Sequence, residues 1–204
     1  LLVRMLLIIH YSERRLPEQR AELYMKATDA MLLPEYALDE TVAERIGRQV
    51  GGSQHVHREM VQHLAFAMQS KGAQQGREIE EYELRNVFQG SPYENVVDDL
   101  IGLTRTRGSL LEEKEETYQF IHLGFQEFLA ARYLAEVTRG DAGIEGIAIF
   151  FEGGPVLESW WREVALLVVA YLSVNAPQNA EKLVRRLAGM DKEAEKRKTP
   201  VDIQ

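Results

Sequence analysis

The spacing of hydrophobic residues changes partway through residues 117–134. At first Tyr118 and Phe120 alternate with other residues, the period-2 pattern of a half-buried strand. Further on, the apolar residues recur at the spacing of a helix face, as Phe125, Phe128, Leu129 and Tyr133. The pattern predicts a strand that leads directly into a helix, with His122 at the junction.

The junction is a candidate site for an anion. The first turn of a helix carries unpaired backbone N–H groups and partial positive charge, which attract anions. The imidazole of His122 could donate a hydrogen bond to the same anion, and Gln126 lies one turn further on the same face. An ordinary buried histidine, with both nitrogens satisfied by the backbone, is the alternative.

The first 52 residues predict a small helical domain. Residues 1–11 are mostly apolar and predict a buried helix, cut off from a longer protein. A second helix begins at Leu16-Pro17-Glu18, because proline suits the first helical position, and it stops before Pro34. A third helix follows Asp39 and ends at Gly51-Gly52.

Residues 53–139 predict a second unit of three helices followed by a β-hairpin. The predicted helices cover residues 53–72, 79–88 and 91–108, the last with a start signal in Ser91-Pro92-Tyr93-Glu94. We expect Leu110 and Leu111 to pair with Tyr118 and Phe120 across the loop 112–116. This order is that of a winged helix.

Residues 140–204 predict the start of a second helical domain. A glycine-rich connection over residues 140–154 leads to a long helix, residues 155–172, which Pro177 ends. Trp160-Trp161 could anchor a partner, but we expect a core position for at least one of them. One more helix is expected around Leu183 and Leu187, before a charged tail. The fold class is therefore mainly α, with one small sheet.

The composition of the chain disfavours several classes of function. The 204 residues are 45% hydrophobic and 27% charged, as expected of a folded chain, with a net charge of −8 that disfavours a general nucleic-acid binder. The chain has no cysteine, which excludes disulfides and thiolate metal sites and fits a reducing cytoplasm. The opening apolar run is too short to span a bilayer, so no membrane association is expected.

Two segments resemble those of one family. The run Phe120-Ile-His-Leu-Gly-Phe-Gln-Glu-Phe-Leu-Ala-Ala131 resembles the F-x-H-x-x-F-Q-E-[FY]-L-A-A signature of NACHT-type STAND ATPases, the signalling class that includes NOD-like receptors. About a hundred residues upstream, LPEQRAELY resembles the L-P-x-x-R-x-x-L-Y run that precedes the winged helix in the same family. The resemblance implies that the chain lies C-terminal to a nucleotide-binding core.

The resemblance also implies a mechanism. The histidine that matches His122 is implied to touch the β-phosphate of ADP in the neighbouring nucleotide-binding domain, and this contact keeps the resting state closed. Exchange of ADP for ATP, with Mg²⁺, would release the winged helix for oligomerisation. Antiviral defence, a common task of bacterial members, is implied in the same way. The family's base-contacting proline would precede Leu1, so that contact cannot be assigned.

The residues do not support a catalytic or metal-binding function. The chain has neither a G-x-x-x-x-G-K-[ST] phosphate loop nor paired acidic residues after an aliphatic run, so it is not expected to hydrolyse ATP itself. His55, His57 and His63 lack the spacing of a zinc site, and no metal is expected.

Two binding functions stay open beside the regulatory one. A winged helix can bind DNA through its third helix. Here that helix carries Glu94, Asp98 and Asp99, and the wing 112–116 is acidic, so both would repel phosphate. Arg105 and Arg107 form the local basic pair. A free-standing helical adaptor that binds a protein partner is the alternative we rank second.

Overall fold

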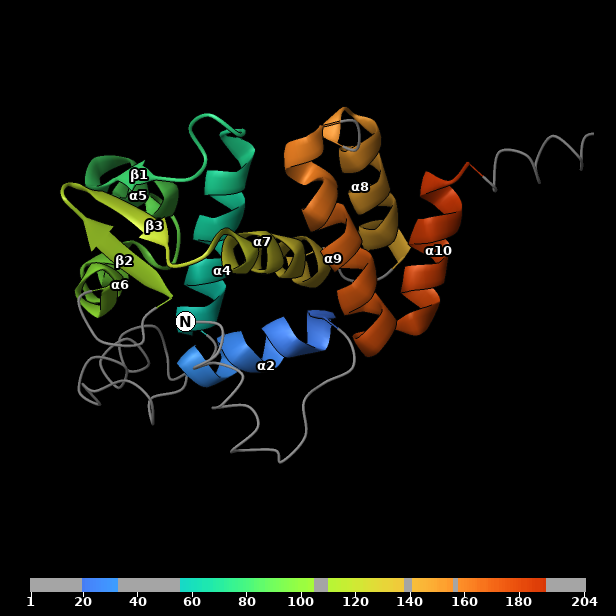
Figure 1. The fold of residues 1–204 in the computed structure, drawn as a ribbon, viewed down its shortest axis with the longest axis horizontal. Coiled ribbons are helices and arrows are strands. Elements are labelled where there is room, and N and C mark those ends of the chain that lie inside the picture. The colour runs from blue at the N-terminus through green and yellow to red at the C-terminus, as the bar shows by residue number, and fades with distance from the viewer. Residues whose placement is uncertain (1–19, 33–55, 105–109, 138–140, 156–157, 190–204) are drawn as a thin grey trace, which may run out of the picture.

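The computed structural model describes residues 20–32, 56–104, 110–137, 141–155 and 158–189 (Figure 1). The predicted helices over residues 1–11 and 39–50 lie outside these ranges, as do the start of the second helix at Leu16, the basic pair Arg105 and Arg107, and the charged tail. None of the described helices is long and apolar enough to cross a membrane.

The winged helix is present in the predicted order. It consists of α4 (Val56–Ser70), β1 (Ile79–Glu80), α5 (Glu81–Phe88), η2 (Glu94–Val96), α6 (Val97–Thr104), β2 (Leu111–Lys114) and β3 (Thr117–Phe120). The strands form an antiparallel sheet of order β1-β3-β2. Leu111 pairs with Phe120, which confirms the predicted hairpin, but Tyr118 pairs with Glu113 and not with Leu110. The fold class, mainly helical with a winged helix, is confirmed.

Three local predictions in this unit need correction. Ile79 and Glu80 do not begin α5 but form β1, whose partner residues, Tyr118 and Thr117, are remote in sequence. Ser91 is not the N-cap of the third helix: its hydroxyl accepts the Tyr93 N–H at 3.1 Å, but a 3₁₀ turn with Tyr93 at its N-cap comes first, and the α-helix begins only at Val97. The hairpin turn is also shorter than the predicted loop 112–116.

The helix α7 (Leu123–Val137) runs through the middle of the molecule, between the winged helix and the C-terminal helices (Figure 1). It packs against α4 on one side and α9 on the other. In α4, four apolar residues recur at helical spacing and are buried: Val56, Met60, Leu64 and Met68. Phe125, Phe128 and Leu129 of α7 are buried as well, so the period change from strand to helix correctly located the central element.

The C-terminal part consists of α8 (Asp141–Glu152), α9 (Ser159–Asn175) and α10 (Pro177–Leu187). The prediction of a glycine-rich connection over residues 140–154 is wrong, because most of this segment is α8. Four of its apolar residues recur at helical spacing and are buried: Ile144, Ile147, Ala148 and Phe151. Their burial outweighs the cost of about 1 kcal/mol for each glycine in the helix. Trp160 and Trp161 are both buried, which confirms the core prediction.

The helix α2 (Arg20–Leu32) lies along one side of α7 and contacts α9 and α4 as well (Figure 1). Its buried residues include Tyr24 and Ala27. The predicted domain boundaries, residues 1–52, 53–139 and 140–204, stay predictions.

Candidate functional site

His122 occupies the N-cap of α7. It precedes the first helical residue, Leu123, and its carbonyl accepts the N–H of Phe125 at 3.0 Å. Its side chain also caps the helix, since Nδ1 accepts the backbone N–H of Gly124 at 3.0 Å. The ring is exposed and meets Phe125 edge-on, with 6.4 Å between the ring centroids. The buried-histidine alternative is therefore wrong.

The capping bond fixes which nitrogen of His122 can donate. A nitrogen that accepts a hydrogen bond must carry a lone pair, so in the neutral ring the proton resides on Nε2. No other described residue bonds to Nε2. His122 thus presents one N–H donor at the positive end of α7, the arrangement that suits a phosphate oxygen.

Gln126 lies in the interior and not beside the exposed ring of His122. It is 1% exposed, and its Nε2 donates to Gln69 Oε1 at 3.0 Å and to the Gly76 carbonyl at 2.9 Å. Gln69 in turn donates to the Trp160 carbonyl at 2.9 Å. The two donor hydrogens of Gln126 are used inside the protein, so any support it gives to a bound phosphate is indirect.

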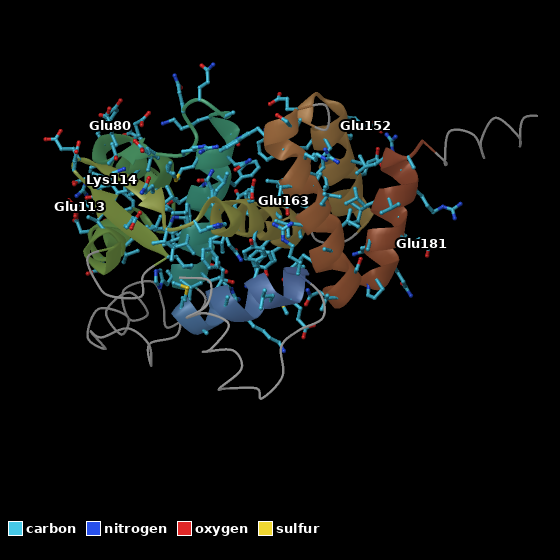
Figure 2. All side chains as sticks on the ribbon, viewed as in Figure 1. Glu80, Glu113, Lys114, Glu152, Glu163 and Glu181 are labelled. Atoms are coloured by element: carbon cyan, nitrogen blue, oxygen red, sulfur yellow. The ribbon has the colours of Figure 1, made fainter. Side chains whose placement is uncertain are left out.

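A charged group borders α7 where it meets α2 and α9. Arg20 of α2 pairs with Glu163 of α9 at 2.5 Å (Glu163 is labelled in Figure 2). The guanidinium of Arg20 also lies over the ring of Tyr24, 5.7 Å from the ring centroid. Burial, and then the charge of Glu163, raise the pKa of Glu127 on α7 to about 7, although Arg20 and Arg77 oppose this shift. Sequence spacing did not identify Glu127, because the charges around it come from other elements.

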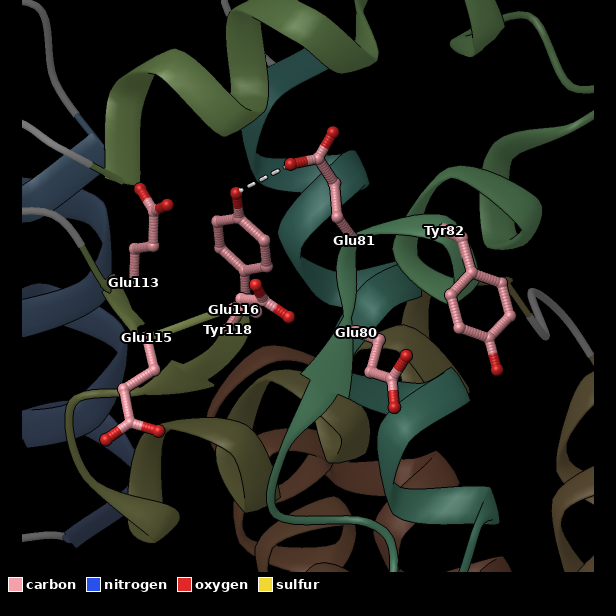
Figure 3. A pocket seen from close by; sticks show the side chains of 7 residues that line it. All are labelled: Glu80, Glu81, Tyr82, Glu113, Glu115, Glu116 and Tyr118. Atoms are coloured by element: carbon pink, nitrogen blue, oxygen red, sulfur yellow. Dashed lines mark hydrogen bonds between the residues drawn. The ribbon is translucent and has the colours of Figure 1, made fainter.

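Five glutamates gather where the wing meets β1 and the start of α5. Glu80, Glu81, Glu113, Glu115 and Glu116 line a cavity of about 310 Å³ with Tyr82 and Tyr118 (Figure 3). The Tyr118 hydroxyl donates to Glu81 at 3.1 Å. The cation Arg85 is held by Glu81 and Asp98 at 2.8 and 2.7 Å. This face would repel a phosphate backbone.

Of the three histidines His55, His57 and His63, the structure describes the last two. His55 lies outside the described residues. His63 stacks on Tyr133, with ring centroids 5.4 Å apart, and burial lowers its pKa. Burial also lowers the pKa of His57, to about 4. Within the described ranges, no three histidine or acidic side chains come together as metal ligands would.

The three-helix unit with its hairpin, followed by α7, defines the class of the protein as a winged helix with a helical extension. The family model of the winged helix-turn-helix domain C-terminal to NACHT matches residues 20–134. This match covers more than half of the 204 residues, and the chain belongs to that family. A domain of this kind is non-catalytic. No curated protein and no solved structure matched the chain.

Proposed function

We propose that this chain is the regulatory part of a NACHT-containing signalling ATPase, and that His122 holds its resting state closed. In this proposal His122 donates from Nε2 to the β-phosphate of ADP bound in the NACHT domain of the same protein. The observation that carries the proposal is the exposed N-cap imidazole, which lies within the matched family region and whose Nδ1 is already engaged by Gly124.

The residues at the site fit such a contact. An Nε2–H donor at a helix N-terminus favours an anion, and the other nitrogen cannot compete for it because the capping bond occupies it. ATP with Mg²⁺ would be held by the NACHT domain and supplies the hydrolysable phosphate. His122 regulates only if it favours one nucleotide state over the other, since a contact of equal strength in both would shift no equilibrium.

Release of this contact would free the winged helix and permit oligomerisation of the protein. His122→Ala, made in the protein that includes its NACHT domain, should therefore raise the oligomeric fraction without a stimulus. Light scattering measures this fraction. The matched control is His63→Ala, because His63 is remote from His122 in sequence and stacks on Tyr133. An oligomeric fraction that is unchanged in His122→Ala would contradict the proposal.

The second candidate is a free-standing adaptor that binds a protein partner. It is favoured by exposed apolar side chains on the C-terminal helices, of which Ile149 and Leu166 are each 58% exposed. The coding sequence upstream of Leu1 discriminates the two functions. A phosphate loop a few hundred residues before Leu1 supports the regulatory function, and its absence supports the adaptor.

A further inference from the structure

Tyr24 of α2 is fitted against the first turn of α7 with no space to spare. A Cβ atom built at Gly124 would overlap the Tyr24 hydroxyl and would lie 3.0 Å from its Cζ atom. Such a contact with the hydroxyl is closer than real Cβ atoms tolerate, so either the helix or the tyrosine would have to shift. Glycine at position 124 is therefore what allows α2 to approach α7 this closely.

The residue that meets Tyr24 is also the residue that fixes His122. Gly124 donates its N–H to His122 Nδ1, and the same hypothetical Cβ would lie 3.0 Å from that nitrogen. The hydroxyl of Tyr24, the backbone of Gly124 and the imidazole of His122 thus share one small volume. A displacement of α2 would change the surroundings of the capping bond directly.

Tyr24 is held firmly at this position. It is 7% exposed, and its ring stacks on Phe128 at 5.7 Å and meets Phe125 edge-on at 5.8 Å. Both phenylalanines belong to α7, so the tyrosine joins α2 to the helix that carries His122. Arg20, one turn before Tyr24, covers the outer side of the ring.

We propose that Tyr24 is a positioning residue for His122: α2, seated on Gly124, keeps the imidazole in its capping geometry with the proton on Nε2. When α2 moves, the cap loosens and His122 no longer presents a single fixed donor. The effect of Tyr24 on nucleotide sensing rests on the proposed function. The geometric claim itself involves only residues of α2 and α7.

The first test uses the 204-residue chain without nucleotide. Nitrogen-15 NMR of the histidine side chains distinguishes a ring with its proton on Nε2 from a mixture of the two tautomers, and His122→Gln identifies the His122 signals. Gly124→Ala should turn one Nε2–H tautomer into a mixture, because the new methyl group displaces either Tyr24 or the capping nitrogen. The double variant Gly124→Ala/Tyr24→Phe should shift the mixture back toward the Nε2–H tautomer, because it removes the hydroxyl, which is the closest contact, and leaves the contacts of 3.0 Å with Cζ and Nδ1, which small shifts relieve.

A single Nε2–H tautomer in Gly124→Ala would overturn the inference, and so would a double variant that behaves like Gly124→Ala alone. Tyr24→Leu provides a second approach if Gly124→Ala does not fold, because it leaves Gly124 intact and removes only the seat of α2. It too should yield a tautomer mixture, and an unchanged His122 spectrum in a folded Tyr24→Leu chain would again overturn the inference.

The second test separates the inference from the proposed function. In the protein that includes its NACHT domain, Gly124→Ala should speed ADP release by about fivefold or more, a typical size for coupling between sites, and the double variant should reverse most of this. If His122→Ala speeds release but Gly124→Ala does not, the coupling through Tyr24 is wrong and the His122 contact stands. If neither variant changes release, the proposed function fails, whereas the tautomer measurement still decides the geometry.

Discussion

Arg132 on α7 donates from Nη1 to Asp29 on α2 at 2.7 Å, across 103 positions of sequence. Its Nε donates to Glu136 at 2.7 Å, and the same carboxylate accepts the Tyr171 hydroxyl of α9 at 2.6 Å and the amide of Gln62 of α4 at 3.2 Å. Arg132, which is 4% exposed, and its partner Glu136 thus connect four helices. Burial lowers the pKa of Arg132, but Glu136 and Asp29 outweigh this effect, and the net shift is upward.

Arg132→Ala should lower the free energy of unfolding by about 3 kcal/mol, because it leaves the partly buried Glu136 carboxylate without its cation. Urea unfolding followed by circular dichroism measures the change. Asp29→Asn is the matched variant, and since the Asp29 side chain is 40% exposed it should cost only about 1 kcal/mol. Equal losses in the two variants would show that burial of Arg132 does not set the strength of the network.

Gln126→Glu should destabilise the protein by more than Gln126→Met does. The new carboxylate would replace an amide donor that faces two oxygen atoms, those of Gln69 and Gly76, whereas methionine only leaves them unbonded. We expect about 2 kcal/mol for Met and at least 1 kcal/mol more for Glu at neutral pH, with the difference shrinking as the carboxyl is protonated. Denaturant unfolding at pH 5 and pH 8 measures both. If Gln126→Glu destabilised the protein less than Gln126→Met, Gln126 would not donate to Gln69 and Gly76 as the structure shows.

The raised pKa of Glu127 predicts a pH-dependent stability. Between pH 4.5, the ordinary value, and pH 7 the unfolded chain loses this proton while the folded protein keeps it, so the contribution of Glu127 to stability falls as pH rises. Glu127→Gln should therefore stabilise the protein by about 1 to 2 kcal/mol at pH 8, a value reduced because water screens a half-buried group, and have little effect at pH 4.

Unfolding free energies of wild type and Glu127→Gln, measured at intervals from pH 4 to pH 8, check this expectation. Glu181→Gln is the control, since the Glu181 side chain is 72% exposed and its ion pair with Arg185, at 3.7 Å, is a surface pair. A stability difference for Glu127→Gln that stays constant across this range would show that Glu127 titrates at its ordinary pH.

The acidic wing predicts that duplex DNA does not bind. The wing carries Glu112, Glu113, Glu115 and Glu116, and Arg85 is already neutralised by Glu81 and Asp98. At low salt, where phosphate contacts are strongest, a fluorescence titration with generic duplex should show no saturable binding up to about 10 μM. Saturable submicromolar binding would instead assign the third helix, α6, the DNA-reading role.

The sequence was informative where one element alone determines the pattern. The change of period before Phe125 located α7, and the apolar stripe beginning at Val56 located α4, because residues on one buried face must follow the repeat of their own helix. The same spacing was present in α8, but its glycines obscured it. Contacts across elements could not be predicted. β1 has only two residues and depends on Tyr118, and Gln126 is buried because Gln69 and Gly76, more than 40 positions away, supply its partners.

The candidate site, too, could be predicted from the sequence only in part. The strand-to-helix pattern placed His122 at the start of α7 from sequence alone. The assignment of its proton to Nε2 required the observed bond from Gly124, and the role of Tyr24 required the packing of α2, since neither depends on local spacing.

The central claim is tested most directly by the rate at which the NACHT-containing protein releases labelled ADP and labelled ATP. His122→Ala should speed ADP release by about tenfold, as expected for the loss of one hydrogen bond to a charged phosphate, and leave ATP release nearly unchanged. Release rates of ADP that are the same in wild type and His122→Ala would contradict the account.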